Sequence, residues 1–573
     1  MEKRAVVLTT IVVFCFAVLF LRLFNIMLLN HQKFARRATI QQTHEIEVKK
    51  RRGIIYDRRG KEFAANIEQK SLYCDPQKVD SPSRTASQLS RFTGMDRREL
   101  LRRLKTGRRF VWIKRKIDCE KAAKIENLRI AGVDFIAEPE RVYPGGKLAS
   151  HIIGFVDIDN NGLAGVERSY DEQLASRGGK LRVTRDARGK ILLAGDELES
   201  IGNSLMLTVD EVLQYIAEDA LDEATRRWRA KSATVIMMNP YTGEILALAN
   251  RPTFNPNAPG KSADSSRRNA AVTDVYEPGS TFKVVTAAAA LEERLYGPQS
   301  RFDVSKGYIV VGRKVIRDVH KNDVLTFEEV IQKSSNVGII QIAERLGKER
   351  LYEYSRRFGF GEKTGIDLPG EIPGWIRGPE QWSGTSIGAV PIGHEIAVTP
   401  LQVLRAYAAI ANGGLLVTPF VVSRVISPDG RVILERQGQA GVRILSSRTS
   451  SLLREILATV TVEGGTAIEA SVEGISVAGK TGTAKIFDSE KRRYSDERYI
   501  SSFVGFFPAD RPLIAMIVTV SEPEGEIFGG KVAAPVFKEI ADKALAYLNI
   551  PMEQGTVQNV IRVSTKNEAE KYY

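Results

Sequence analysis

Cysteine and histidine are scarce in this chain, whose 573 residues include three cysteines and five histidines. Cys15 lies in an apolar run, which leaves Cys74 and Cys119 and excludes a framework of several disulfides. The histidines are dispersed and form no ligand motif, so no metal centre is expected. We interpret them as structural or surface residues: His31, His44, His151, His320 and His394.

Nucleic-acid modules are also missing, although the net charge of +14 suits an anionic partner. There is no paired Cys/His spacing and no aromatic-rich platform for single strands, so we expect no nucleic-acid partner. Charge alone does not choose between a membrane surface and an acidic polymer. With 43% hydrophobic and 27% charged residues, the chain is long enough for one large core and at least one smaller domain.

The amino terminus is predicted to be a transmembrane anchor, over residues 1–30. Apolar residues run from Ala5 to Leu29 with few interruptions, and about 20 such residues span a bilayer. The rival interpretations are a cleaved signal peptide, for which the run lacks a small-x-small cleavage pattern, and a buried core helix. Positive residues flank both ends and leave the orientation open: Lys3 and Arg4 before the run, and Lys33, Arg36 and Arg37 after it.

Residues 31–205 are predicted to form a β-rich pedestal or interaction domain. The segment is rich in charge and in short β-like stretches punctuated by glycine, such as 52–60 and 143–146. No catalytic constellation occurs there. Basic runs such as 114–116 are interpreted as solvated charged faces in preference to contacts with lipid or glycan.

Residues 206–552 are predicted to form an α+β domain, and 553–573 a loose polar tail. Asp210 is a plausible cap for a first amphipathic helix. The predicted strands are 233–238 and 245–249, which form a hairpin, and 475–478, 502–507 and 514–520, with a helix covering 536–545. Strands at both ends of a helical middle indicate a single antiparallel sheet covered by helices, with an all-helical lobe inserted between its strands.

Ser280 and Lys283 are the candidate nucleophile and base. Pro278 and Gly279 precede an alanine-rich helical run, so Ser280 is expected at a helix amino terminus. Residues i and i+3 share a helix face, which brings the lysine to the hydroxyl, and burial lowers a lysine pKa enough for it to take the proton. The helix N–H groups would stabilise an oxyanion. A capping serine with an exposed lysine is the alternative for this Ser-x-x-Lys.

Two weaker elements follow in the sequence. Ser334 and Asn336 offer a hydroxyl for proton relay and a carboxamide for a substrate amide, although both types populate turns for local reasons. Lys480, Thr481, Gly482 and Thr483 follow a predicted strand, where they would bind a carboxylate, permit close backbone approach and supply a second oxyanion donor. Lys-Thr-Gly also occurs at 105–107 and 363–365, so only the strand context favours the third copy.

These three elements, in this order, resemble the active-site signature of penicillin-binding proteins and serine β-lactamases. The similarity to class B penicillin-binding proteins covers nearly the whole chain. It includes 277–280, 386–388, 396–402, 464–467 and the pedestal segments 51–66 and 141–155. One departure is the interval between Gly388 and Gly393, which is longer than the family spacing.

The resemblance implies the serine β-lactamase/penicillin-binding transpeptidase fold and peptidoglycan D,D-transpeptidation. Ser280 would attack the D-Ala-D-Ala bond of a stem peptide, D-Ala would leave, and an amine of a neighbouring stem would resolve the ester; β-lactams would acylate the same serine. No metal or organic cofactor is implied. The implied roles are base for Lys283, proton relay for Ser334, substrate-amide anchor for Asn336, and carboxylate and oxyanion contacts for Lys480, Thr481 and Thr483.

Within class B, the run 276–283, with glutamate before Pro-Gly, looks closest to the septal, division-specific type. That type implies a single-pass protein of the cytoplasmic membrane with its catalytic domain on the periplasmic face. The implied partners are a polytopic glycan polymerase and other division proteins. The alternatives are an elongation-type transpeptidase, a D,D-carboxypeptidase or β-lactamase that uses water, a non-enzymatic β-lactam receptor, and an idle scaffold.

Overall fold

The computed structural model describes residues 2–33, 43–47, 49–176, 180–184, 199–438, 441–488, 491 and 493–550. The chain forms two compact units, of which unit 1 comprises Met1–Gly53, Asn66–Glu140 and Ala175–Asn203, and unit 2 comprises Ile54–Ala65, Arg141–Leu174 and Ser204–Tyr573. Two segments of the predicted pedestal therefore belong to unit 2. The predicted limits of the four regions stay a prediction, and the predicted tail 553–573 lies outside the described residues.

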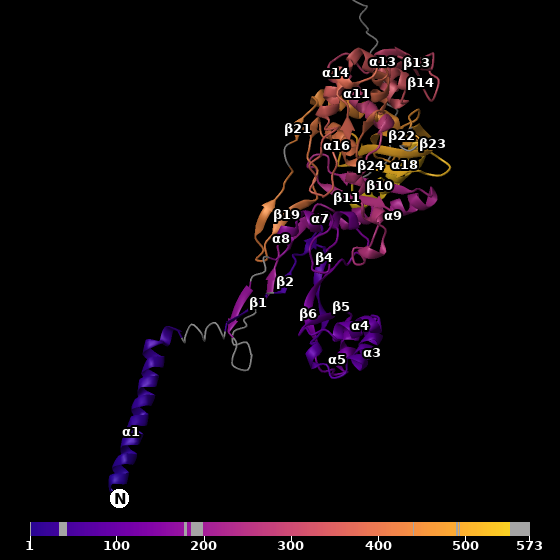
Figure 1. Ribbon diagram of the computed structural model, residues 1–573. Coiled ribbons are helices and arrows are strands. Elements are labelled where there is room, and N and C mark those ends of the chain that lie inside the picture. The colour runs from indigo at the N-terminus through magenta and orange to yellow at the C-terminus, as the bar shows by residue number, and fades with distance from the viewer. Residues whose placement is uncertain are drawn as a thin grey trace, which may run out of the picture. The chain divides into compact units, whose positions relative to one another are not determined.

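Unit 1 begins with the apolar helix α1 (Glu2–Phe24), which continues as a π-helical turn, η1 (Asn25–Leu29) (Figure 1). Its large hydrophobic side chains are exposed along the whole length. Among the described residues this is the one helix, Lys3–Leu29, long and apolar enough to cross a membrane. An isolated apolar helix with no protein core around it fits a membrane anchor.

The rest of unit 1 holds a small α/β core. The end of β4 (Glu62–Cys74) pairs with β5 (Val111–Ile117), while β1 (Thr43–Glu47) pairs with β7 (Lys180–Thr184). Three helices that the sequence analysis did not predict pack beside the strands: α3 (Pro82–Thr93), α4 (Arg97–Leu104) and α5 (Cys119–Glu126). Their buried leucines, isoleucines and alanines form a core with Leu72 and Cys74.

Unit 2 is built on a five-stranded sheet of order β11-β10-β24-β23-β22, antiparallel throughout, as predicted. The strands are β10 (Ser232–Met238), β11 (Ile245–Arg251), β22 (Ala478–Asp488), β23 (Arg493–Phe507) and β24 (Ile514–Ser521). The predicted strand 475–478 is wrong, because β22 begins at Ala478. Its polar, glycine-containing sequence gave no strand pattern, and pairing with β23 makes it a strand.

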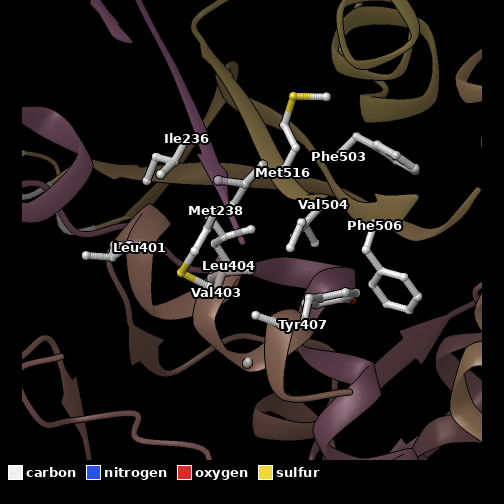
Figure 2. Packing of buried hydrophobic residues seen from close by; sticks show 14 of the residues in the cluster. Ile236, Met238, Leu401, Val403, Leu404, Tyr407, Phe503, Val504, Phe506 and Met516 are labelled. Atoms are coloured by element: carbon white, nitrogen blue, oxygen red, sulfur yellow. The ribbon is translucent and has the colours of Figure 1, made fainter. Parts of the chain in front are cut away.

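Helices cover both faces of this sheet (Figure 1). Figure 2 shows Met238 and Val504 directed toward Leu404 of α16 (Pro400–Ala411), whereas Phe503 points to the other face. There it meets Phe537 of α18 (Gly529–Tyr547), with ring centroids 4.8 Å apart. The helix α9 (Glu211–Arg227) also packs on the sheet and begins at Asp210, whose carboxylate accepts from the N–H groups of Val212 and Leu213, as predicted.

The region inserted between β11 and β22 carries the helices that face the site. It contains α11 (Lys283–Glu292), α12 (Phe327–Gln332), α13 (Asn336–Leu346) and α14 (Lys348–Arg357). The expectation of an all-helical lobe is wrong, because two short antiparallel strand pairs accompany the helices: β12 (Arg301–Asp303) with β15 (Val324–Thr326), and the hairpin of β13 (Tyr308–Val311) with β14 (Lys314–Arg317). These strands are only three or four residues long, too short for a clear period-two pattern.

Residues 54–65 of the pedestal contribute β3 (Ile55–Tyr56) to a second sheet. There β3 pairs with β9 (Ser204–Leu207), which pairs with β19 (Val422–Ile426). In the other pedestal segment of unit 2, Arg141 and Glu167 form a fully buried ion pair, 2.7 Å between Nε and Oε1.

Candidate active site

Ser280 lies where a 3₁₀ turn, η6 (Gly279–Phe282), leads into α11. Gly279 has φ +56°, in the left-handed region that glycine tolerates, and its N–H donates to the carbonyl of Gly393 at 3.2 Å. The turn places Ser280, half-buried, in the wall of a cavity of about 680 Å³. The predicted helix amino terminus is therefore where the candidate nucleophile lies.

Lys283 is fully buried in the first turn of α11. Its Nζ donates to the carbonyl of Ser334 at 2.6 Å and to Oδ1 of Asn336 at 2.7 Å, and it lies 3.2 Å from Oγ of Ser334. The structure thus joins the first two predicted elements through the lysine. It shows no Lys283–Ser280 hydrogen bond, so the contact expected from their i, i+3 spacing is not made in this state.

A carboxylate group that the sequence analysis missed, that of Asp318, holds the Ser334–Asn336 turn. Asp318 follows β14 and accepts from Oγ of Ser335 at 2.7 Å, from N of Val337 at 3.0 Å, and from N of Asn336. Ser334 itself has φ +59°, a strained conformation for a residue with a side chain. Asn336 also donates from Nδ2 to the carbonyl of Arg317 at 2.9 Å, so both ends of its carboxamide have protein partners.

The site contains two buried lysines whose pKa values are lowered. Burial lowers the pKa of Lys283 from 10.5 to about 7, although the nearby Asp318 carboxylate opposes the shift. Burial, and secondly repulsion from Lys283, hold the pKa of Lys480 well below its usual value. A neutral Lys283 keeps two N–H donors, enough for its two close oxygen partners, and has a lone pair for a further proton.

The Lys480 segment lies on β22, at the edge of the sheet and against the nucleophile turn. Lys480 is fully buried, with Nζ 3.4 Å from Oγ1 of Thr481, and Thr481 in turn pairs with Oγ1 of Thr466 at 3.0 Å. A methyl group on Gly482 would lie 2.4 Å from Oγ of Ser502 and 3.1 Å from the carbonyl of Pro278. Only glycine lets β22 approach the turn this closely.

The other copies of these motifs have different surroundings. Residues 105–107 follow α4 in unit 1, and in residues 363–365 the Thr364 N–H donates to Glu371 at 2.6 Å. Neither copy contributes to the cavity. A Gly-x-Ser-x-Gly sequence at 384–388 offers no second nucleophile, because its Ser386 is fully buried and donates to Oε2 of Glu395 at 2.7 Å.

Several cavity residues had no signal in the sequence analysis. Thr483 accepts from N of Gly529 at 3.1 Å, which brings the start of α18 to the rim. His394 enters from the 393–395 loop, where its Nδ1 lies 2.7 Å from Oε2 of Glu277. Other wall residues without a predicted role are Val319, His320, Asn322, Lys333, Ile392, Phe528, Gly530 and Lys531.

This arrangement brings together a serine at a helix start, a lysine of lowered pKa one helical turn away, and the Lys480 segment of β22. A serine alkoxide forms only when a base accepts its proton, and neutral Lys283 is such a base at neutral pH. The strand hydroxyls favour an anionic substrate group, and so does the Lys480 amine, which a neighbouring carboxylate would keep protonated. The chemistry that fits is transfer of an acyl group from a carboxylate-bearing substrate to the serine.

Comparison with known proteins gives two family matches. Residues 233–542 match the model for the penicillin-binding protein transpeptidase domain, and residues 47–207 match the model for the penicillin-binding protein dimerisation domain. Together the two models cover most of the chain.

Similar proteins extend over nearly the full length. Stage V sporulation protein D of Bacillus subtilis is 35% identical, over 97% of this chain and 88% of its own length. The probable peptidoglycan D,D-transpeptidase PenA of Neisseria meningitidis is 34% identical (87% and 85%), and the peptidoglycan D,D-transpeptidase FtsI of Escherichia coli is 31% identical (88% and 85%). The crystal structure of penicillin-binding protein 3 of Mycobacterium tuberculosis with aztreonam superposes with a TM-score of 0.70 at 30% identity, covering 88% of this chain and 98% of that one.

Proposed function

We propose that this chain uses Ser280 as its nucleophile and Lys283 as the base. The chain belongs to the class B penicillin-binding proteins and is a serine D,D-transpeptidase of peptidoglycan. The observation that carries the assignment is the buried lysine of lowered pKa one helical turn after a serine in the cavity wall. The experiment that tests it is chemical trapping of the serine, described below.

In the first half-reaction, Lys283 takes the hydroxyl proton of Ser280 as the oxygen attacks the carbonyl of the D-Ala-D-Ala bond. Ser334, 3.2 Å from the lysine, then passes the proton to the leaving D-Ala amine. Asn336 holds Lys283 in place through its Oδ1, and on substrate binding its amide exchanges an internal partner for the substrate amide. The strained Ser334 turn, held by Asp318, keeps this relay in position.

The Lys480 segment binds the substrate and stabilises the oxyanion. Lys480 and Thr481 contact the terminal carboxylate, and the Thr483 N–H joins the helix start of α11 in donating to the developing negative charge. Gly482 allows the strand to lie against the nucleophile turn. In the second half-reaction an amine of a neighbouring stem peptide attacks the acyl-enzyme.

The septal role is the finer part of the proposal. The glutamate before Pro278-Gly279 supports it, and Glu277 bonds directly to His394 in the cavity wall. Depletion in the native cell separates the types: a division enzyme gives filaments with unfinished septa, whereas an elongation enzyme gives rounded cells. A fluorescent fusion found along the side wall instead of at midcell would contradict the septal assignment.

The membrane arrangement is likewise proposed: α1 anchors the chain in the cytoplasmic membrane, with the catalytic region on the periplasmic face. Its exposed apolar length supports the anchor. The orientation is checked by adding protease to intact spheroplasts, where the catalytic region should be digested. Protection until the membrane is lysed would reverse the orientation.

The proposed partner is a polytopic glycan polymerase that contacts the anchor and the pedestal. Co-purification from native membranes measures it, with an anchor-swapped chain as the comparison. Loss of the polymerase on swapping the anchor supports the contact, and its retention after both anchor and pedestal are replaced contradicts it.

Intact mass of the full-length protein in detergent, after incubation with benzylpenicillin, tests the nucleophile. We expect a stable adduct of one penicillin on the wild type and none on Ser280→Ala. Ser334→Ala is the informative companion, because it keeps the nucleophile and should form the adduct slowly. An adduct that persists on Ser280→Ala would move the nucleophile to another residue.

A further inference from the structure

A second cavity of about 370 Å³ lies in unit 2, and the proposed donor reaction makes no use of it. Its wall carries both signs of charge and four aromatic rings. Within the part of the chain that the structure describes, the guanidinium of Arg377 has no ion-pair partner and stacks over the ring of Trp375, 5.5 Å from its centroid. The other charged and aromatic lining residues are Tyr276, Glu277, Glu395, Phe487, Tyr494 and Lys485, which is paired with Asp496.

The two cavities share thin walls. Glu277 lines the second cavity, while Gly279 and Ser280 line the first. In two other segments, consecutive residues line different cavities. His394 and Thr483 line the first cavity, and the residues that follow them, Glu395 and Ala484, line the second. Three elements far apart in the sequence therefore separate the second cavity from the nucleophile by the thickness of one or two residues.

The Glu277 carboxylate contacts three residues of the wall between the two cavities. Glu277 accepts from N of Glu395 at 3.0 Å and from the hydroxyl of Tyr494 at 2.9 Å, and its Oε2 lies 2.7 Å from Nδ1 of His394. Because a carboxylate only accepts, Nδ1 of His394 carries a hydrogen in this contact, and Nε2 is the ring nitrogen left to exchange a proton with the cavity. The backbone of Glu395 is left-handed, φ +58°, so the wall is a strained structure.

The chemistry of the second cavity fits a zwitterionic peptide. Arg377 suits a carboxylate, Glu277 and Glu395 suit an ammonium, and exposed Trp375 and Phe487 suit the aliphatic part between them. A stem peptide with a free side-chain amine has all three features. The acyl-enzyme of the proposed function requires such an amine as its second substrate.

We propose that the second cavity is the acceptor site, where Arg377 holds a carboxylate of the acceptor stem peptide and the amine reaches the acylated Ser280 past His394. This inference rests on the proposed function, and it names the place and the residues of its second half-reaction. The acceptor is thereby recognised through its carboxylate as well as through its amine.

In the transfer step, the acyl group moves from Ser280 to the acceptor amine. The acceptor arrives as an ammonium and gives one proton to Nε2 of His394, which passes it to solvent. The free amine attacks the ester carbon, a C–N bond forms, and the bond from that carbon to Oγ of Ser280 breaks. The second nitrogen proton goes through Lys283 to Oγ, which restores the serine hydroxyl.

Binding to the penicillin-blocked enzyme tests the site without turnover. Full-length protein acylated by benzylpenicillin has its first cavity occupied, so a stem tripeptide with a free side-chain amine and no D-Ala-D-Ala reports on the second. We expect the wild type to bind the free-acid tripeptide about tenfold more tightly than its amidated form, the size of one charge-assisted hydrogen bond. Arg377→Gln should remove this preference, and Arg377→Lys should restore part of it.

Two variants sharpen the result. Trp375→Ala should weaken both forms of the tripeptide equally. Arg227→Gln is the matched control, because Arg227 also stacks on a tryptophan, 5.0 Å from the Trp228 centroid, and lines neither cavity. Equal binding of both peptide forms by the wild type, or an unchanged preference in Arg377→Gln, would place the acceptor elsewhere.

Transfer kinetics test the role of His394. With a thioester donor, His394→Asn should lower kcat for transfer to the tripeptide about tenfold and leave the acceptor KM unchanged, because the lost group takes a proton and holds no peptide. An altered KM with unchanged kcat would make His394 a binding residue and overturn its role in the step. Failure of benzylpenicillin to acylate the wild type is a separate outcome, which overturns the proposed function itself.

Discussion

The same tripeptide, Lys-Thr-Gly, occurs twice in unit 2 in opposite surroundings. At 480–482 it lies near the start of β22, with a fully buried lysine and a glycine packed against the nucleophile turn. At 363–365 the lysine and the glycine are exposed, and the buried threonine donates to Glu371. The difference teaches that burial and neighbours, and not the three side chains, give the motif its chemistry.

Removal of the lysine should give the largest contrast between the copies. Lys480→Ala deletes the buried amine that would pair with the substrate carboxylate, and we expect the rate of acylation by benzylpenicillin to fall at least about 100-fold. Lys363→Ala should change it less than about twofold, because that side chain is exposed and lines no cavity. Stopped-flow or gel-based acylation rates measure both; equal losses would remove the distinction between the copies.

The pH dependence should follow the buried lysines. With a Lys283 pKa of about 7, the base is protonated in acid, so acylation at pH 6 should be about tenfold slower than its plateau above pH 8. A rate that is flat from pH 6 to 9 would exclude Lys283 as the base.

The same shift affects stability. The folded chain loses the Lys283 proton near pH 7, whereas the unfolded chain keeps it up to about 10.5. The unfolded state therefore binds more protons in that interval, and this lysine makes the free energy of unfolding rise with pH between those values. Below pH 7 its unfavourable contribution is constant. Urea unfolding at several pH values, with Lys283→Met as reference, measures the slope.

A methyl group added to the glycine should slow acylation in one copy of the motif and lower stability in the other. Gly482→Ala places Cβ 2.4 Å from Oγ of Ser502 and 3.0 Å from Thr281, so the nucleophile turn must move, and acylation should slow about tenfold. Gly365→Ala meets only ordinary contacts but has φ +85°, which should cost about 1 kcal/mol of stability and leave acylation unchanged. Thermal unfolding and acylation rates together separate the two effects.

The threonines should give the smallest contrast. Thr481→Val removes a hydroxyl paired with Thr466 and facing the substrate, and acylation should fall roughly threefold to tenfold with little change in stability. Thr364→Val removes a hydroxyl bonded to Glu371, which should cost about 1 kcal/mol and spare acylation. Slower acylation in Thr364→Val, with acylation unchanged in Thr481→Val, would show that the copy at 363–365 takes part in catalysis.

Local patterns were enough to predict much of the fold. Short apolar runs indicated β10, β11 and β24, and Asp210 indicated the start of α9, because each signal lies within a few residues of sequence. The limits of β22 were wrong, since its strand state depends on pairing with β23. The inserted strand pairs β12–β15 and β13–β14 were missed because their strands are only three or four residues long.

Part of the site could likewise be predicted from the sequence, and part could not. The order of the motifs predicted that Ser280, Lys283 and the Lys480 segment act together, and in the structure Ser280, Thr481 and Thr483 line the same cavity. The partners of Lys283 at residues 334 and 336 were not predicted, because they are 51 and 53 residues away and the helix spacing pointed to Ser280. His394 and Glu277 are 117 residues apart, and no local pattern records a contact of that kind.

The Asp318 carboxylate extends the set of residues on which Lys283 depends. It stands outside every motif, yet it holds the backbone on which Ser334 and Asn336 present their oxygens to Lys283. A substitution there alters how the lysine is held without changing any residue of the three motifs. Two chains with identical motifs can therefore differ in reactivity through a residue on the β14 side of the site.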